Sequence, residues 1–117
     1  MTIADVKSIL NAELRAGDCL DTEVFYAFGS DMMSDVLAYV KEQAVLLTGL
    51  VNPQVVRTAE MMDMKCIVFV RGKNPDASMI ELAEENGIPL LKTNREMFTS
   101  CGILYEHGLR GGAKATL

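Results

Sequence analysis

The stretch from Ala44 to Val70 constrains the fold of this chain more than any other part of the sequence. It begins with the apolar run Ala44–Thr48 and ends with Cys66–Val70, which is apolar at every position. Such runs are typical of strands that are covered on both faces. Between them, Asn52 and Pro53 predict the N-cap and the first residue of a helix. The order of strand, helix and strand predicts a βαβ unit with parallel strands.

Further helices and strands alternate along the rest of the chain. Helices are predicted at about 3–11, 32–43, 76–86 and 94–107, and strands at about 12–16, 23–28 and 88–91. This alternation predicts an α/β fold, a single compact domain with a mainly parallel sheet of about four to five strands and helices packed on it. We assign residues 1–108 to this domain and the glycine-rich residues 109–117 to a flexible C-terminal tail.

Short polar residues precede the predicted helices and indicate N-caps. The predicted caps are Thr2 with Asp5, either Ser30 or Asp31, Asn52, Asn74, and Thr93 with Glu96. Apolar spacing also predicts which side chains face the core. In the helix after Pro53 these are Val55, Val56, Ala59 and Met62, with Met61 as a further candidate, and in the last helix they are Met97, Phe98, Cys101, Leu104 and Tyr105.

Composition excludes several classes of protein. The formal net charge is −5 and the basic residues are scattered, which argues against a nucleic-acid partner. No apolar run reaches the roughly 18 residues that span a bilayer, and the N-terminus does not resemble a signal peptide. We therefore expect no membrane partner and a cytoplasmic location. The cysteines at 19, 66 and 101 have no metal-ligand spacing, so reduced thiols and no metal site are expected.

Motifs for catalysis are absent from the sequence. Neither nucleotide fingerprint, G-x-x-x-x-G-K-[ST] or G-x-G-x-x-G, occurs. The single histidine, His107, falls near the end of the last predicted helix, where a cation is favourable. No catalytic residue and no cofactor are therefore predicted, and the chain is not expected to be an enzyme.

Four turns follow predicted strands and are the places where a ligand is expected. In open α/β sheets, ligands bind beyond the carboxyl ends of the strands. These turns are Gly29–Asp31, Thr48–Asn52, Arg71–Lys73 and Thr93–Asn94. As ligand-binding residues we predict Ser30, Asp31, Thr48, Gly49 and Asn52, through side-chain or backbone hydrogen bonds. The alternative is that these residues are only the caps and turns that every α/β domain needs.

The pattern of these segments is similar to that of a stand-alone DRTGG domain over about residues 2–108. The residues that carry the resemblance are Ser30-Asp31, Ser34-Asp35, Thr48-Gly49, Gly87–Leu91, Thr93 and Phe98. The literal D-R-T-G-G string is absent, and Leu50-Val51 stands where related domains often have acidic and basic residues. The resemblance implies a fold similar to the N-terminal domain of HPr kinase/phosphorylase. It also implies a regulatory domain that associates with its own copy, as in some inorganic pyrophosphatases.

These observations favour a non-catalytic regulatory or ligand-sensing module that acts as a homodimer, with a small anion or a nucleotide as the expected ligand. The alternative is a pure protein–protein interaction module without a small-molecule ligand. The methionine-rich helices motivate that alternative, because methionine makes adaptable interfaces.

Overall fold

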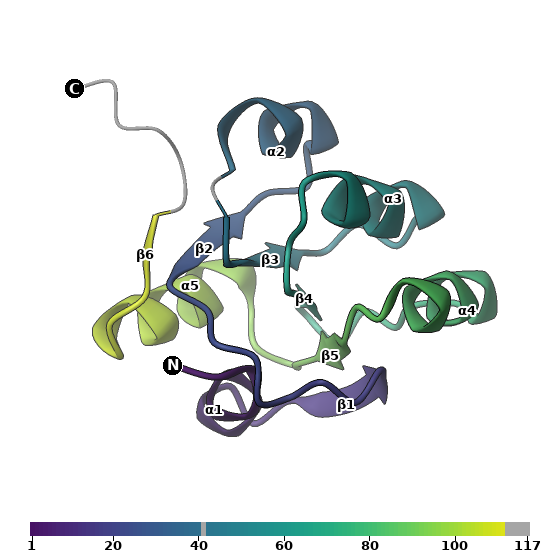
Figure 1. Ribbon diagram of the computed structural model, residues 1–117. Helices are drawn as coiled ribbons and strands as arrows, with labels where there is room; N and C mark the ends of the chain where they lie inside the picture. Colours follow the sequence, from purple (N-terminus) through teal and green to yellow (C-terminus); the bar gives the residue numbers. More distant parts are fainter. Residues whose placement is uncertain (41, 112–117) are drawn as a thin grey trace.

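The computed structural model describes residues 1–40 and 42–111, in which helices and strands alternate from β2 onward (Figure 1). The helices are α1 (Ile3–Ile9), α2 (Met33–Tyr39), α3 (Pro53–Met61), α4 (Ala77–Asn86) and α5 (Met97–Glu106). The strands are β1 (Glu13–Ala16), β2 (Tyr26–Gly29), β3 (Ala44–Thr48), β4 (Cys66–Phe69), β5 (Leu90–Lys92) and β6 (Arg110–Gly111).

The strands form one sheet in the order β1-β5-β4-β3-β2-β6. Every neighbouring pair is parallel except β1 and β5. The predicted α/β class and the mainly parallel sheet are therefore confirmed, but the sheet has six strands rather than four to five. The additional strand is β6, whose two residues are too few to give an alternating apolar pattern in sequence.

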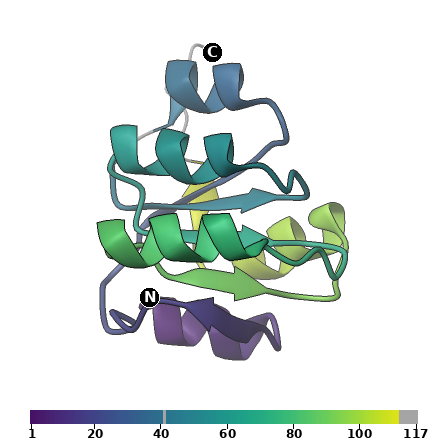
Figure 2. The same ribbon diagram turned by 90° about the vertical axis from the view of Figure 1, so that its right-hand side faces the viewer.

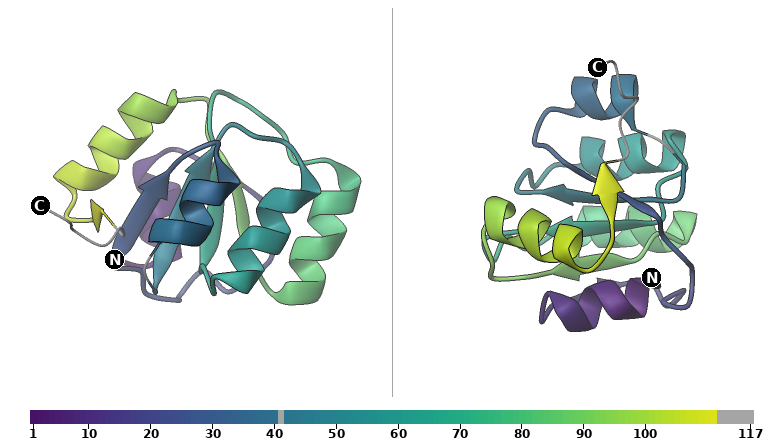
Figure 3. Two further views of the ribbon diagram at one scale, coloured as in Figure 1. Left: turned by 90° about the horizontal axis from the view of Figure 1, so that it is seen from above. Right: turned by 90° about the vertical axis from the view of Figure 1, so that its left-hand side faces the viewer.

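Helices cover both faces of the sheet, and this is why β3 and β4 are buried along their whole length. Leu46 and Phe69 pack with residues of α2, α3 and α4, which lie side by side on one face (Figure 2). Leu47 and Val68 pack with residues of α1 and α5, which lie on the opposite face (Figure 3). Full burial of one such side chain stabilises the fold by about 2 kcal/mol, so the predicted βαβ unit forms the centre of two cores.

Two predicted helix caps are confirmed. The Thr2 hydroxyl accepts a hydrogen bond from the Asp5 N–H at 3.2 Å, and the Asp5 carboxylate accepts one from the Thr2 N–H at 2.9 Å. The bond from the Thr2 N–H is the main cause of the lowered pKa of Asp5. At α3 the Asn52 side chain accepts from the Gln54 N–H at 2.8 Å. These caps satisfy backbone donors that a helix start would otherwise leave unpaired.

Two other predicted caps are wrong. Helix α4 is capped by Asp76, whose carboxylate accepts from the Met79 N–H at 2.9 Å, and Asn74 lies before the buried Pro75 instead of at the cap. Helix α5 begins after Glu96 without a side-chain cap. Thr93 lies four residues before the first residue of the helix, and its hydroxyl accepts the Arg95 N–H at 3.3 Å and donates to the Leu10 carbonyl at 2.9 Å.

Three apolar side chains predicted to face the core are exposed instead. Met61 is 71% exposed, Phe98 88% and Tyr105 59%. The half-buried Met62 continues the apolar face of α3, and the helical period turns its neighbour Met61 away from that face. Helix α5 buries Ser100 and Leu104, and the helical period of 3.6 residues turns positions 98 and 105 away from that face.

Several boundaries also differ from those predicted. Strand β2 begins at Tyr26 instead of residue 23, and α2 ends at Tyr39 instead of residue 43. Gln43 has a left-handed backbone with φ of 52°, and its carbonyl accepts the Phe25 N–H at 2.9 Å. The longest helices described, α4 and α5, have ten residues each. None of the helices within residues 1–40 and 42–111 is long and apolar enough to cross a membrane.

The folded part of the chain extends past the predicted domain boundary at residue 108. Leu109 is 3% exposed and packs with the core that contains α1 and α5. Arg110–Gly111 then pairs with β2 as β6. The rest of the predicted tail, residues 112–117, lies outside the described residues.

Candidate functional site

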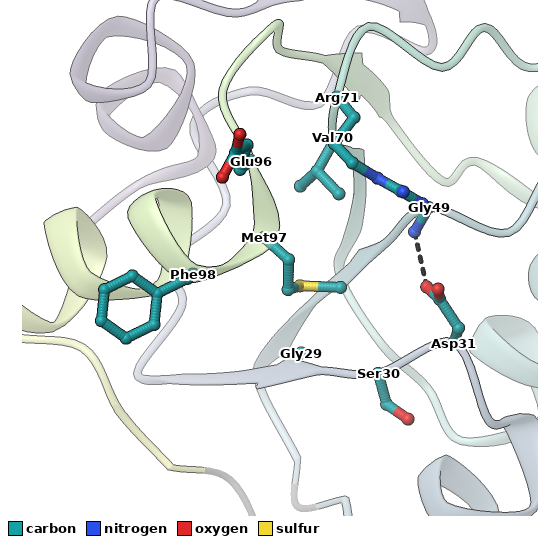
Figure 4. Close-up of a pocket in the computed structure, with 9 residues that line it drawn as sticks. All are labelled: Gly29, Ser30, Asp31, Gly49, Val70, Arg71, Glu96, Met97 and Phe98. Atoms are coloured by element: carbon teal, nitrogen blue, oxygen red, sulfur yellow. Dashed lines mark hydrogen bonds between the residues drawn. The ribbon is translucent and has the colours of Figure 1, made fainter.

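An open cleft lies where β2, β3 and β4 end and α5 begins (Figure 4). Its volume is about 450 Å³, which falls in the range of pockets that hold small molecules. The cleft is lined by Gly29, Ser30, Asp31, Gly49, Val70, Arg71, Glu96, Met97 and Phe98. Because the carboxyl ends of parallel strands meet here, three of the four predicted turns contribute to one cavity.

Asp31 joins the turn after β2 to the turn after β3. One carboxylate oxygen of Asp31 accepts the Gly49 N–H at 2.7 Å and the Thr48 hydroxyl at 3.0 Å. Asp31 therefore does not cap α2, which corrects the prediction made from its position before a helix. Asp31 makes these two bonds instead of capping α2 because they give a partner to the buried Thr48 hydroxyl and to the Gly49 N–H.

Ser30 is not the cap of α2 either. Its hydroxyl accepts the Met32 N–H at 2.9 Å, so it closes a turn before the helix instead of binding the helix itself. Helix α2 begins after Met32 with no side-chain hydrogen bond at its start. Ser30, Asp31 and Gly49 are thus the predicted site residues that lie in the cleft lining.

The other two predicted site residues lie outside the lining. Thr48 is fully buried, and besides its bond to Asp31 its hydroxyl accepts the Leu50 N–H at 3.1 Å. Thr48 therefore stabilises the turn after β3 from the core side. Asn52 is used as the cap of α3, where its side chain is committed to the helix start.

Arg71 is the cation of the cleft. It falls in one of the four turns where a ligand was expected, but it was not among the five predicted binding residues. It directly follows the buried segment of β4, adopts a left-handed backbone with φ of 57°, and donates its N–H to the Arg95 carbonyl at 2.8 Å. Its guanidinium lies against Gly49, where an added Cβ would be 2.5 Å from an arginine nitrogen. Among the described residues, this guanidinium makes no hydrogen bond and no ion pair, so its donors are available to an anion.

Helix α5 supplies the opposite side of the cleft. Glu96 precedes the helix, and its carboxylate has no hydrogen-bond partner within the described part of the chain. In Figure 4 the Met97 side chain lies between the residues of α5 and those of the turns after β3 and β4, and Phe98 stands at the outer rim. The fourth predicted turn, Thr93-Asn94, does not line the cleft. Local sequence pattern does not show that α5 lies beside the turns after β3 and β4, because these segments are far apart in the chain.

Gly29 sets the distance between β2 and α5. A Cβ at this position would be 2.7 Å from the Cys101 sulfur and 3.1 Å from the Met97 sulfur. A side chain at this position would require the Cys101 and Met97 side chains to shift, and Met97 lines the cleft, so the shape of the cleft depends on this glycine.

Groups with catalytic potential lie away from the cleft or are not activated. Burial raises the pKa of the Cys66 and Cys101 thiols, and a hydrogen bond to Asp18 is the main cause of the raised pKa of Cys19. The nucleophilic form of cysteine is the thiolate, so these thiols are poor nucleophiles. His107 bonds through Nδ1 to the Ile103 carbonyl at 2.8 Å. Within residues 1–40 and 42–111, no cluster of three or more His, Cys, Asp or Glu side chains forms a metal site.

These features define a doubly covered α/β domain with a mixed-charge cleft at its strand ends. The sequence matches the model of the DRTGG domain over residues 5–106, and the chain therefore belongs to the DRTGG domain family. No curated protein matches it in sequence.

One similar solved structure contains the CBS and DRTGG domains of the regulatory region of Clostridium perfringens pyrophosphatase, in complex with the activator diadenosine tetraphosphate. The TM-score is 0.70 at 15% sequence identity, and the match covers 88% of this chain and 45% of that chain. This likeness supports the fold. The chain thus corresponds to less than half of the regulatory region that it resembles.

Proposed function

We propose that this protein is a non-catalytic regulatory module that senses a small anionic ligand or a nucleotide in the cleft. The observation that carries the proposal is Arg71, whose guanidinium is without a partner among the described residues and lies in a cavity of about 450 Å³. The similar regulatory region with its nucleotide activator is consistent with this class of ligand.

The proposal is tested by a thermal-shift screen of nucleotides and small anions, followed by calorimetry on each positive compound. We expect at least one nucleotide to raise the melting temperature. A matched pair of variants then locates the site. Arg71→Gln is expected to weaken binding at least tenfold, since it removes a charge-assisted contact. Arg57→Gln, an exposed arginine of α3 outside the cleft lining, is the control and leaves binding unchanged. A flat screen contradicts the proposal.

We also propose that the module works as a homodimer. Burial of large apolar side chains that are exposed in the single chain would stabilise an association of this kind. They are Leu14, Phe25, Met32, Leu37, Tyr39, Val51, Met61, Phe98 and Tyr105. Sedimentation velocity over a range of protein concentrations tests the dimer, and a monomer at micromolar concentration contradicts it.

The same exposed side chains favour a second candidate function, a pure interaction module in which the cleft has no ligand. The two candidates differ in one measurement. The ligand-sensing module responds to nucleotides in the thermal-shift screen, whereas the interaction module is unresponsive to them and still associates.

A further inference from the structure

The charges of the cleft restrict the class of ligand beyond the proposed function. One cation, Arg71, faces two carboxylates, Asp31 and Glu96. The Asp31 carboxylate already accepts hydrogen bonds from Thr48 and Gly49, so the Gly49 N–H is not free for a phosphate. The cleft therefore has one place for an anionic group, at Arg71, and no second cation in its lining for a further phosphate.

Glu96 differs from Asp31 because its carboxylate has no partner among the described residues. A free carboxylate in a ligand cleft accepts hydrogen bonds from hydroxyl or amino groups, as acidic residues do from ribose hydroxyls in nucleotide sites. The same carboxylate repels a second or third phosphate group. In the view of Figure 4, the Val70 and Met97 side chains lie between the Glu96 carboxylate and the Arg71 guanidinium, so the anion contact and the hydrogen-bond acceptor are at different places in the cleft.

Between these two ends the lining is apolar. Val70 and Met97 contribute to it, whereas Phe98, which is 88% exposed, lies at the outer rim. An apolar surface between an anion contact and a hydrogen-bond acceptor suits a ligand with a ring system in its middle. The cavity volume of about 450 Å³ is far larger than a single inorganic anion requires.

We infer that the cleft binds a nucleoside monophosphate and discriminates against nucleoside polyphosphates. The single phosphate lies at Arg71, the hydroxyl or amino donors of the nucleoside lie at Glu96, and the ring contacts Val70 and Met97. This inference rests on the proposed function, since it names the ligand class of the same cleft. This ligand class is not taken over from the similar structure. The activator there, diadenosine tetraphosphate, carries more phosphate groups than this cleft accepts.

Calorimetry on the full chain tests the inference with the monophosphates and triphosphates of adenosine, guanosine, cytidine and uridine, and with diadenosine tetraphosphate. All titrations are made without divalent cations and at one ionic strength. A triphosphate carries about two more negative charges than a monophosphate, and each charge near a carboxylate lowers affinity about two- to threefold. For the nucleoside that binds best, we therefore expect the monophosphate to bind about four- to ninefold more tightly than the triphosphate.

The variant Glu96→Gln identifies the cause of the discrimination. It is expected to raise triphosphate affinity about fivefold and to narrow the difference between the two ligands. Glu106→Gln is the matched control, because Glu106 is an exposed glutamate at the other end of α5, and it leaves the ratio unchanged. A thermal melt of each variant shows that it is folded, and Glu96 makes no cap bond whose loss would unfold α5.

The outcomes separate this inference from the proposed function. If a triphosphate or diadenosine tetraphosphate binds as tightly as any monophosphate, or if Glu96→Gln leaves the ratio unchanged, the inference is overturned while the sensing function stands. If none of these nucleotides binds but small anions do, the inference also fails and an anion sensor remains. If neither class binds, the proposed function fails as well.

Discussion

Helices α3 and α4 begin in a different way from helices α2 and α5. The first two are capped by residues adjacent in sequence, since Asn52 accepts from the Gln54 N–H and Asp76 accepts from the Met79 N–H. The other two have no side-chain cap. Both of the uncapped starts stand at the cleft, where Ser30, Asp31 and Glu96 precede them.

This difference shows where tertiary contacts prevail over local preference. Asp31 and Thr93 are suited to cap α2 and α5, but Asp31 bonds to the turn after β3 and Thr93 bonds to the Leu10 carbonyl. Places where local sequence rules and the structure disagree are typical of functional or strained positions. The uncapped starts of α2 and α5 therefore lie in the same region of the molecule as Arg71, whose backbone is left-handed.

The largest expected effect concerns how closely the start of α5 is held against β2. Gly29→Ala puts a methyl group 2.7 Å from the Cys101 sulfur, and such overpacking lowers the free energy of unfolding by about 2 kcal/mol. Gly102→Ala is the control, because nothing lies within 4 Å of a Cβ there, and alanine in a helix stabilises by up to about 1 kcal/mol. Urea unfolding measures both. Equal stability of Gly29→Ala and the parent chain contradicts the close approach of helix and strand.

The second prediction tests whether Asp31 acts through the β3 turn or through α2. Asp31→Ala leaves the buried Thr48 hydroxyl without its acceptor and is expected to cost about 1.5 kcal/mol of stability. Asp35→Ala, one helical turn further along in the first turn of α2, is expected to change stability by less than about 0.5 kcal/mol. A similar loss in both variants, measured by chemical unfolding, indicates that the helix start is what matters.

The third prediction compares a capped helix with an uncapped one directly. Asn52→Ala removes the cap of α3 and is expected to destabilise the protein by about 1 kcal/mol. Glu96→Ala removes a side chain that makes no cap bond, so its effect on the free energy of unfolding is expected to be close to zero. If the two variants lose the same free energy of unfolding, the difference between a capped α3 and an uncapped α5 is contradicted.

The smallest effect is a pH dependence at the α4 cap. The Ser78 hydroxyl and the Met79 N–H donate to the Asp76 carboxylate, and these bonds lower the pKa of Asp76 below its usual value of 3.8. A carboxyl with a lowered folded pKa stabilises the protein above its unfolded pKa and loses that contribution as pH falls through the folded pKa. We expect Asp76→Ala to be less stable than the parent at neutral pH, and the difference to shrink in strong acid. A difference that stays constant with pH contradicts a role for the charge.

Sequence reasoning reached the parts of the fold that depend on short-range pattern. The buried runs at Ala44–Thr48 and Cys66–Val70 predicted the central strands, because a strand covered on both faces is apolar throughout. The caps at Thr2 and Asn52 were predicted since each side chain reaches an N–H two or three residues away. The turns of the cleft were located for a related reason, as parallel strands bring their carboxyl ends to one edge.

The composition of the cleft could not be predicted in the same way. Arg71 meets Gly49 only because β3 and β4 pair in the register that joins Thr48 to Phe69. Glu96 and Phe98 reach the cleft because α5 crosses the face of the sheet opposite α2, α3 and α4. These contacts join residues far apart in sequence, and no local pattern records them. The available signals were that Arg71 is the first polar residue after the buried run and that it falls in one of the four turns where a ligand was expected.

Arg71 also has a consequence for how this domain tolerates change. A non-glycine residue in the left-handed region costs roughly 1 kcal/mol, and Arg71 holds such a conformation with φ of 57°. Glycine would relieve that cost and would also remove the guanidinium from the cleft. A library selected only for thermal tolerance should therefore enrich Arg71→Gly, whereas a library selected for response to a ligand should discard it. This single position separates fitness for folding from fitness for sensing.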